Sequence, residues 1–245
     1  FDVGEYDRSR TLVIDPAVLV YCGFIGGNGT EAGAGIAVDA AGCAYITGTT
    51  TSTETSFPVA AGPDLTHDAS VDAFVVKVKA DGTGLVYCGF IGGDGGDYGN
   101  GIAVDAAGCA YVAGTTDTHH ASFPVTVGPD LVYGATGTGG YPDAFIAKVN
   151  AAGTALAYCG YIGGRDEDRG YAVAVDGAGC AYVTGFTTND ESLELHFPVL
   201  VGPDTSFNGV VDTFVTKVRT DGTGYVYSGF IGGLQSDYGH AIAVD

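Results

Sequence analysis

An acidic side chain recurs at one position of the sequence, after each of four Gly-Gly pairs and two residues before a further glycine. Carboxylates at this spacing have two chemical uses. The simpler use is an Asx-type turn, in which the carboxylate accepts hydrogen bonds from backbone N–H groups. The alternative is a calcium site, because Ca²⁺ prefers several hard oxygen ligands and neighbouring acids supply more of them. The recurring acids are Glu31, Asp97, Asp168 and Asp237, and the neighbouring acids are Asp94 and Asp166.

Six cysteines form three pairs with a constant separation of 21 residues. A fourth copy of the motif has Ser228 at the first position, and its second position lies beyond the sequence. This coincidence favours disulfides between the two members of each pair, each worth about 3 kcal/mol. Free buried thiols are the alternative, and no Cys-x-x-Cys motif supports zinc, an iron–sulfur cluster or haem. The pairs are Cys22 and Cys43, Cys88 and Cys109, and Cys159 and Cys180.

Three of the four lysines also share a repeated position. A substrate contact would seldom be copied identically into every repeat, so we expect these lysines to pair with repeated carboxylates. The sequence contains no Gly-x-Ser-x-Gly motif and no phosphate-binding glycine pattern, and we therefore predict no enzyme. The lysines are Lys77, Lys148 and Lys217, and the carboxylates are Asp39, Asp105 and Asp176.

All of these residues belong to an internal repeat. The segment Tyr-Cys-Gly-Phe-Ile-Gly-Gly, which begins at Tyr21, returns with small changes after 66, 71 and 69 residues, at Tyr87, Tyr158 and Tyr227. A Gly-Ile-Ala-Val-Asp block and an Asp-Ala-Phe-Val-Val-Lys-Val block repeat between these copies. Such self-similarity indicates a repeat architecture, in which neighbouring units stack to bury their faces.

Each unit consists of β-branched and aromatic runs separated by Gly, Asp and Asn, which is typical of strands and turns. In the first unit the predicted strands are residues 36–39, 44–48, 72–78 and 85–91, and we expect no helix. Four strands per unit make one blade of a β-propeller, with the first strand nearest the axis. The predicted fold class is therefore all-β, a β-propeller of four-stranded blades.

We treat residues 1–245 as a single propeller domain, but its repeats do not make a whole number of four-stranded blades. Their approximate bounds are 11–34 (partial), 35–100, 101–170, 171–240 and 241–245 (partial). The fourth blade is therefore split between the two ends. It either closes a ring within the chain or takes strands from the next subunit, which would build a filament head to tail. The third alternative is that the chain is a fragment of a larger propeller.

The order of these motifs resembles that of the SBBP family of bacterial and archaeal β-propeller repeats. The shared motifs are Gly-Phe-Ile-Gly-Gly, Asp-Tyr-Gly, Gly-Ile-Ala-Val-Asp, Phe-Pro-Val and Asp-Ala-Phe-x-x-Lys-Val, and the segment Thr11–Pro16 resembles the strand that leads into the first repeat. The resemblance covers nearly the whole chain and implies a scaffold used in secreted or surface-associated proteins. The cysteines depart from the family, which usually has Ser, Thr or Asn at their positions.

The charge balance excludes other classes of protein. Nine Lys and Arg face 29 Asp and Glu, a formal net charge of −20, so no basic face is available for nucleic acid. The longest apolar stretch, residues 16–27, is too short for a membrane span. The chain begins at Phe1 and contains no Met, so either a leader has been removed or the start of the protein is not part of this sequence. We therefore expect an extracellular or cell-surface protein.

The predicted function is a non-enzymatic structural or adhesive surface protein that associates with copies of itself and with surface glycans. Almost every notable polar residue belongs to a repeated column, whereas a catalytic site usually breaks the symmetry. The alternative is a secreted propeller that binds or hydrolyses carbohydrate or peptide with the connections between its second and third strands. These connections are residues 49–71, 115–142 and 187–211.

Overall fold

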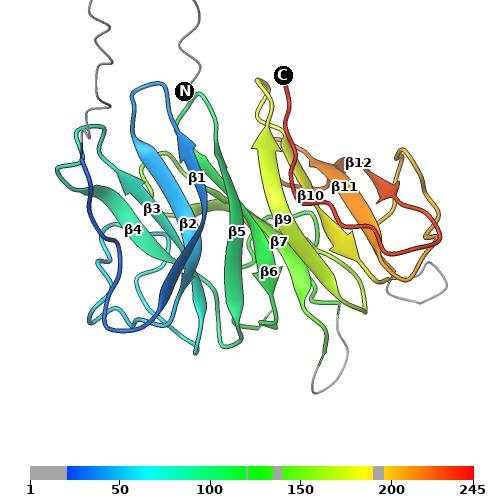
Figure 1. Cartoon of the computed structure of the whole chain (residues 1–245), viewed down its shortest axis with the longest axis horizontal. Coiled ribbons are helices and arrows are strands. Elements are labelled where there is room, and N and C mark those ends of the chain that lie inside the picture. Colours follow the sequence, from blue (N-terminus) through cyan, green and yellow to red (C-terminus); the bar gives the residue numbers. More distant parts are fainter. Residues whose placement is uncertain (1–20, 120, 135–139, 190–195) are drawn as a thin grey trace, which may run out of the picture.

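A computed structural model of the chain describes residues 21–119, 121–134, 140–189 and 196–245. These residues form twelve β-strands and contain no helix, which confirms the all-β prediction (Figure 1). Accordingly, the described part of the chain has no helix long and apolar enough to cross a membrane. The strands are β1 (Glu31–Val38), β2 (Ala44–Thr50), β3 (Asp72–Val78), β4 (Leu85–Ile91), β5 (Asp97–Val104), β6 (Ala110–Thr116), β7 (Asp143–Val149), β8 (Leu156–Ile162), β9 (Asp168–Val175), β10 (Ala181–Thr187), β11 (Asp212–Val218) and β12 (Tyr225–Ile231).

The strands form three four-stranded antiparallel sheets in chain order: sheet A (β1–β4), sheet B (β5–β8) and sheet C (β9–β12). The predicted bounds of β3 and β4 agree with the structure. β1 begins five residues earlier than predicted, at Glu31, because its pairing with β2 continues past an irregularity between Gly33 and Gly35. The segment 11–20, which includes the predicted leading strand, lies outside the described residues.

The turn between the first two strands of each sheet follows from its sequence. In sheet A, Asp39 Oδ1 accepts hydrogen bonds from the N–H groups of Ala41 (3.0 Å) and Cys43 (2.9 Å). Gly42 has a φ of +83°, a left-handed conformation that costs glycine nothing. The same bonds recur around Asp105 and Asp176, so one Asp-x-x-Gly pattern builds all three turns.

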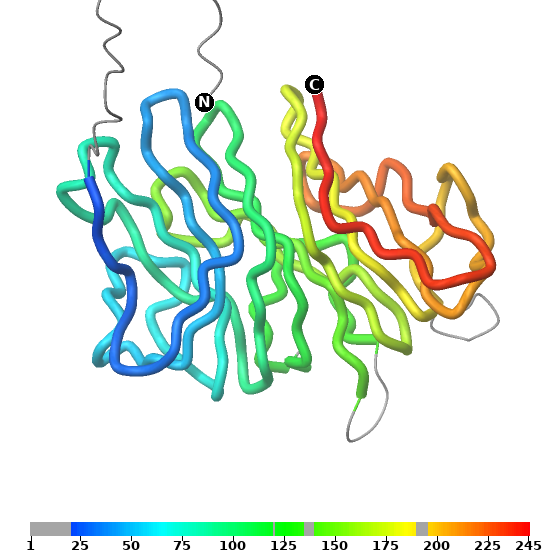
Figure 2. Tube along the Cα trace, viewed as in Figure 1, coloured from blue at the N-terminus to red at the C-terminus, as the bar shows by residue number. Residues whose placement is uncertain are grey.

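The sheets pack face against face, with sheet B between sheets A and C (Figure 2). Because side chains alternate between the two faces of a strand, each strand of sheet B contributes to both junctions. In β7, Phe145 packs against residues of sheet A, whereas Ile146 packs against residues of sheet C. The hydrophobic core is therefore divided into two junction clusters, and a third cluster lies on the outer face of sheet A.

The first strands of the three sheets, β1, β5 and β9, lie next to one another. A Cβ atom placed on Gly101 would be 2.9 Å from the Cα of Ala172 and the carbonyl oxygen of Tyr171. A side chain at this position would therefore collide with backbone, which explains the glycine at position 101.

Candidate functional site

Three of the predicted acids lie at the first position of a strand. Glu31, Asp97 and Asp168 begin β1, β5 and β9. The reason is that pairing with the second strand extends to these residues, each of which is opposite a threonine.

The acidic column holds the preceding Gly-Gly corner, because each acid accepts a hydrogen bond from the N–H of the residue four positions earlier. Asp97 Oδ2 accepts bonds from the Gly93 N–H and the Thr118 hydroxyl, both at 2.9 Å. The corresponding N–H bonds to Asp168 and Asp237 are 2.8 and 2.9 Å long. The acids therefore accept backbone N–H bonds as predicted, but from the corner before them and not within an Asx-type turn.

The neighbouring acids do not join this column. Asp94 is exposed, and its carboxylate contacts the Ser122 hydroxyl. The Asp166 N–H donates to Asn189 Oδ1 at 2.8 Å. No group of three or more His, Cys, Asp or Glu residues suited to a metal occurs in the part of the chain that the structure describes. The predicted combinations of Asp94 with Asp97 and of Asp166 with Asp168 therefore supply no such group.

The sequence analysis missed a second acidic column, which faces the first. Each of its members begins the third strand of a sheet and packs toward the first strand of the next sheet. A Cβ atom placed on Gly163 would be 2.7 Å from Asp168 Oδ2 and 3.0 Å from Asp143 Oδ1, so both carboxylates border the same small space. The sequence pattern that could have revealed this column is the aspartate at the start of each Asp-x-Phe block. The members are Asp72, Asp143 and Asp212.

Burial dominates the electrostatics of these acids. It raises the pKa of Asp97 to about 7 and that of Asp143 to about 8. It raises the pKa of Asp72 to about 6 and that of Asp168 well above the ordinary value, and the nearby Asp143 carboxylate adds to the shift at Asp168. Each sheet junction thus encloses two carboxyl groups in surroundings that disfavour their charge.

The lysine column forms three copies of one cluster, as the sequence predicted. The three lysine Nζ atoms lie 3.4, 3.7 and 2.9 Å from Asp39, Asp105 and Asp176 in turn. Each Nζ is also 4.7 Å from the centre of a tyrosine ring, a favourable cation–π distance. In sheets A and B the tyrosine hydroxyl lies 3.2–3.3 Å from a carbonyl oxygen of the next sheet. The cluster therefore connects adjacent sheets.

The cysteines are free thiols, and the predicted disulfides are not formed. The geometry gives the reason. Cys88 packs in the cluster on the outer face of sheet A, whereas Cys109 packs at the junction of sheets B and C. The two side chains therefore belong to different clusters, and a bond between them would require the backbone to move. Burial raises the pKa of the Cys88 thiol to about 12, which disfavours the reactive thiolate.

The segment after β12 packs on sheet C as the first strand of a further sheet would. The Asp237 N–H donates to the Val211 carbonyl at 2.8 Å, and the equivalent bonds at Asp97 and Asp168 are 2.9 and 2.8 Å long. A Cβ atom on Gly239 would be 2.3 Å from Thr184 Oγ1, as one on Gly99 would be from Thr47 Oγ1. Residues 237–245 thus reproduce the position of β5 and β9, although no second strand pairs with them among the described residues.

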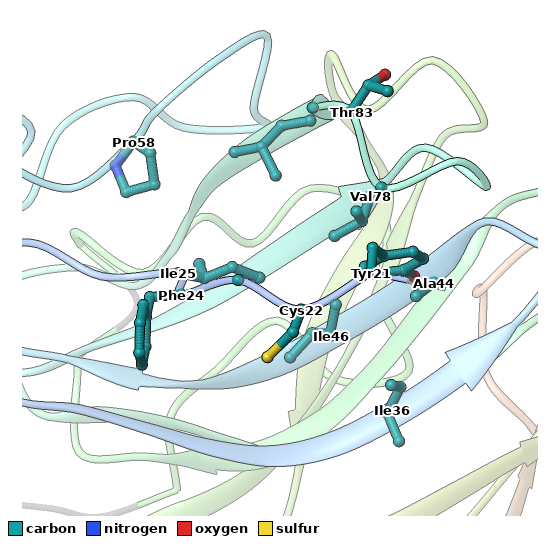
Figure 3. Close-up of a pocket in the computed structure, with 14 residues that line it drawn as sticks. Tyr21, Cys22, Phe24, Ile25, Ile36, Ala44, Ile46, Pro58, Val78 and Thr83 are labelled. Carbon is teal, nitrogen blue, oxygen red and sulfur yellow. The ribbon is translucent and has the colours of Figure 1, made fainter. Parts of the chain in front are cut away.

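The segment before β1 takes the position of the last strand of a preceding sheet. The Tyr21 ring lies against Gly82, just as Tyr87 lies against Gly153 and Tyr158 against Gly222. Residues 21–25 cross the outer face of sheet A and border a cavity of about 450 Å³ (Figure 3). Ile25 packs toward the cluster on this face, but Phe24 is fully exposed.

The variable connections are partly outside the described residues, because residues 120, 135–139 and 190–195 belong to them. Their described parts pack a phenylalanine of each Phe-Pro pair into a hydrophobic cluster. No protein-family model matches the chain, and no curated protein matches it either.

Proposed function

We propose that this chain is a non-enzymatic, extracellular structural or adhesive protein, a β-propeller of the SBBP repeat type that assembles head to tail. The observation that carries this proposal is the complementarity of its two end faces. The exposed face of sheet C is equivalent to the faces of sheets A and B that receive the next sheet. The outer face of sheet A is equivalent to the faces of sheets B and C that dock onto the preceding sheet.

Exposure at equivalent positions supports the proposal. Ile91 is fully buried at the junction of sheets A and B, whereas its counterpart Ile231 is 54% exposed on sheet C. At the opposite end, Ile36 is 69% exposed, and its counterpart Ile102 is only 8% exposed. Each end therefore presents apolar side chains that are buried wherever a neighbouring sheet covers them.

The terminal segments support the same interpretation. Residues 21–25 and 237–245 occupy the positions of the last and first strands of a further sheet. Contact between the sheet A end of one copy and the sheet C end of another would bring these two segments into one shared unit. Contacts of this heterologous kind extend into filaments unless the rotation between copies closes a ring.

Two end-face variants test the proposal. Ile36→Asp places a charge on the sheet A end, and Ile231→Asp places one on the sheet C end. Val132→Asp is the matched control, because Val132 is 56% exposed on a connecting loop. Light scattering and negative-stain electron microscopy should show filaments or oligomers for the parent and the control, and monomers for each end variant.

Mixing the two end variants makes the test specific. Each variant retains one intact end, so an equimolar mixture should form a dimer with one copy of each and proceed no further. A parent chain that stays monomeric at high concentration would overturn head-to-tail assembly in favour of closure within one chain. Oligomers that persist in both end variants would also overturn it.

A further inference from the structure

The junctions between sheets contain buried carboxylate oxygens without hydrogen-bond partners. Asp143 and Asp168 are 1% and 0% exposed, and the Oδ1 atom of each has no partner in the described part of the chain. The same holds for Oδ1 of Asp72 and Asp97, which are 1% and 0% exposed. Unpaired buried oxygens are costly, and their repetition at equivalent positions indicates a common ligand.

The two carboxylates of a junction face one small space. Around Gly163, Asp143 Oδ1 and Asp168 Oδ2 both lie within 3.0 Å of the position that a Cβ atom would take. Gly92 has the same relation to Asp72 Oδ1 and Asp97 Oδ2, at 3.2 and 2.6 Å. The glycines keep this space clear of a side chain at both junctions.

One oxygen of each carboxylate accepts hydrogen bonds, and in Asp168 it is the oxygen that faces Gly163. Asp143 Oδ2 accepts a bond from the Gly134 N–H at 2.9 Å, and Asp168 Oδ2 accepts bonds from the Gly164 N–H and the Asn189 amide. Donors of this kind stabilise the ionised form of a carboxylate. These bonds offset only part of the cost that burial places on the charged forms, because the pKa values of both groups remain raised.

The described lysines do not neutralise these anions. Lys77, Lys148 and Lys217 pair with the carboxylates of the turns after the first strands. His67 favours the charged form of Asp72, whereas no cationic side chain of the described residues is among the main influences on the pKa of Asp143 or Asp168. Two ionised carboxylates at the junction of sheets B and C would therefore require a bound cation.

We propose that a divalent cation, Ca²⁺, binds between the two carboxylates of each buried junction, at Asp143 with Asp168 and at Asp72 with Asp97. One such ion balances both charges, which a single shared proton cannot do. Ca²⁺ tolerates irregular shells of six to eight oxygens, so backbone carbonyls and water can complete the shell, whereas Mg²⁺ demands a near-octahedral one. The sites lie inside the repeat array and do not depend on head-to-tail assembly.

Metal analysis of the full-length chain is the direct test. After treatment with chelator and dialysis against Ca²⁺, the parent should retain about two tightly bound ions per chain. Asp143→Asn and Asp168→Asn should each lose one of them. Asp94→Asn, which changes an exposed acid of the same region, should lose none. A parent that retains no Ca²⁺ would overturn the proposal.

Terbium luminescence gives a second readout, which begins with the parent chain alone. Tb³⁺ takes calcium sites, and two tyrosines lie near this one: Tyr133 precedes Gly134, whose N–H bonds to Asp143, and its ring contacts that of Tyr161. Excitation of tyrosine should produce Tb³⁺ emission from the parent that Ca²⁺ abolishes and Asp143→Asn weakens. No Tb³⁺ emission, together with an Asp168→Asn variant as stable as the parent, would show that the acids share a proton instead.

Discussion

The internal junctions and the end face of sheet C are built from the same residues in different surroundings. At the junction of sheets B and C, Tyr111 bonds both to Asp105 of its own sheet and to the Gly179 carbonyl of the next. At the end of sheet C, Tyr182 bonds to Asp176 and receives a bond from Lys217, but it has no carbonyl partner from a following sheet among the described residues.

This difference teaches that the repeat specifies a junction as much as a sheet. Each unit carries both halves of the contact, the face that docks onto the preceding sheet and the face that receives the next. A terminal unit must therefore expose one half unless another element covers it. The stability of a unit consequently depends on its position in the array, although its sequence is nearly constant.

The largest expected effect comes from shortening the isoleucine at two equivalent positions, one at a junction and one on the end face. Ile162 is fully buried at the junction of sheets B and C, whereas its counterpart Ile231 is 54% exposed on the end face. Ile162→Ala should lower the free energy of unfolding by about 2–5 kcal/mol, because it leaves a cavity. Ile231→Ala should cost about 1 kcal/mol or less in dilute solution. Urea unfolding of the two variants measures both values, and equal losses would contradict the comparison.

Removing a tyrosine hydroxyl should lower the free energy of unfolding by a smaller amount. Tyr111→Phe removes bonds to Asp105 (3.0 Å) and to the Gly179 carbonyl (3.3 Å) while keeping the ring under Lys148. We expect a loss of about 1–3 kcal/mol, since one partner is charged and the other would remain unpaired at the junction. Tyr182→Phe should cost less, because its hydroxyl bonds only within sheet C among the described residues. Thermal unfolding of the two variants under identical conditions decides the order.

Most of the sheet structure could be predicted because it depends on local signals. The Asp-Ala-Phe-Val-Val-Lys-Val block fixed β3, and the Asp-x-x-Gly pattern fixed the first turn. The start of β1 at Glu31 could not be predicted, because Gly33 and Gly35 weaken the strand pattern and a bulge shifts the register.

The candidate sites were less predictable, because contacts between sheets depend on which face of a strand a side chain occupies. A constant spacing of 21 residues suggested that Cys88 and Cys109 are bonded, yet they pack in different clusters. Conversely, Asp143 and Asp168 meet across a junction although nothing in the spacing of the two columns pairs them. The lysine and aspartate pairing was correct, because both residues lie at the same end of a single sheet.

The smallest expected effect concerns how the lysine clusters make stability depend on pH. The cluster of Lys77 and Asp39 lies at an internal junction, whereas that of Lys217 and Asp176 lies at the end face of sheet C. Hydrogen bonds and charge from Lys217 lower the pKa of Asp176 to about 2. At Asp39 burial opposes the hydrogen bonds from Cys43 and Tyr45 and the charge of Lys77, but the pKa is still lowered. A carboxyl whose folded pKa lies below its unfolded value stabilises the fold above pH 4, and this contribution disappears as the pH falls toward 2. Carbon-13 titration of the carboxyl groups should show a larger upward shift for Asp176 in Lys217→Met than for Asp39 in Lys77→Met. Equal shifts would mean that the neighbouring sheet does not alter the cluster, and the distinction between junction and end face would not extend to its charged residues.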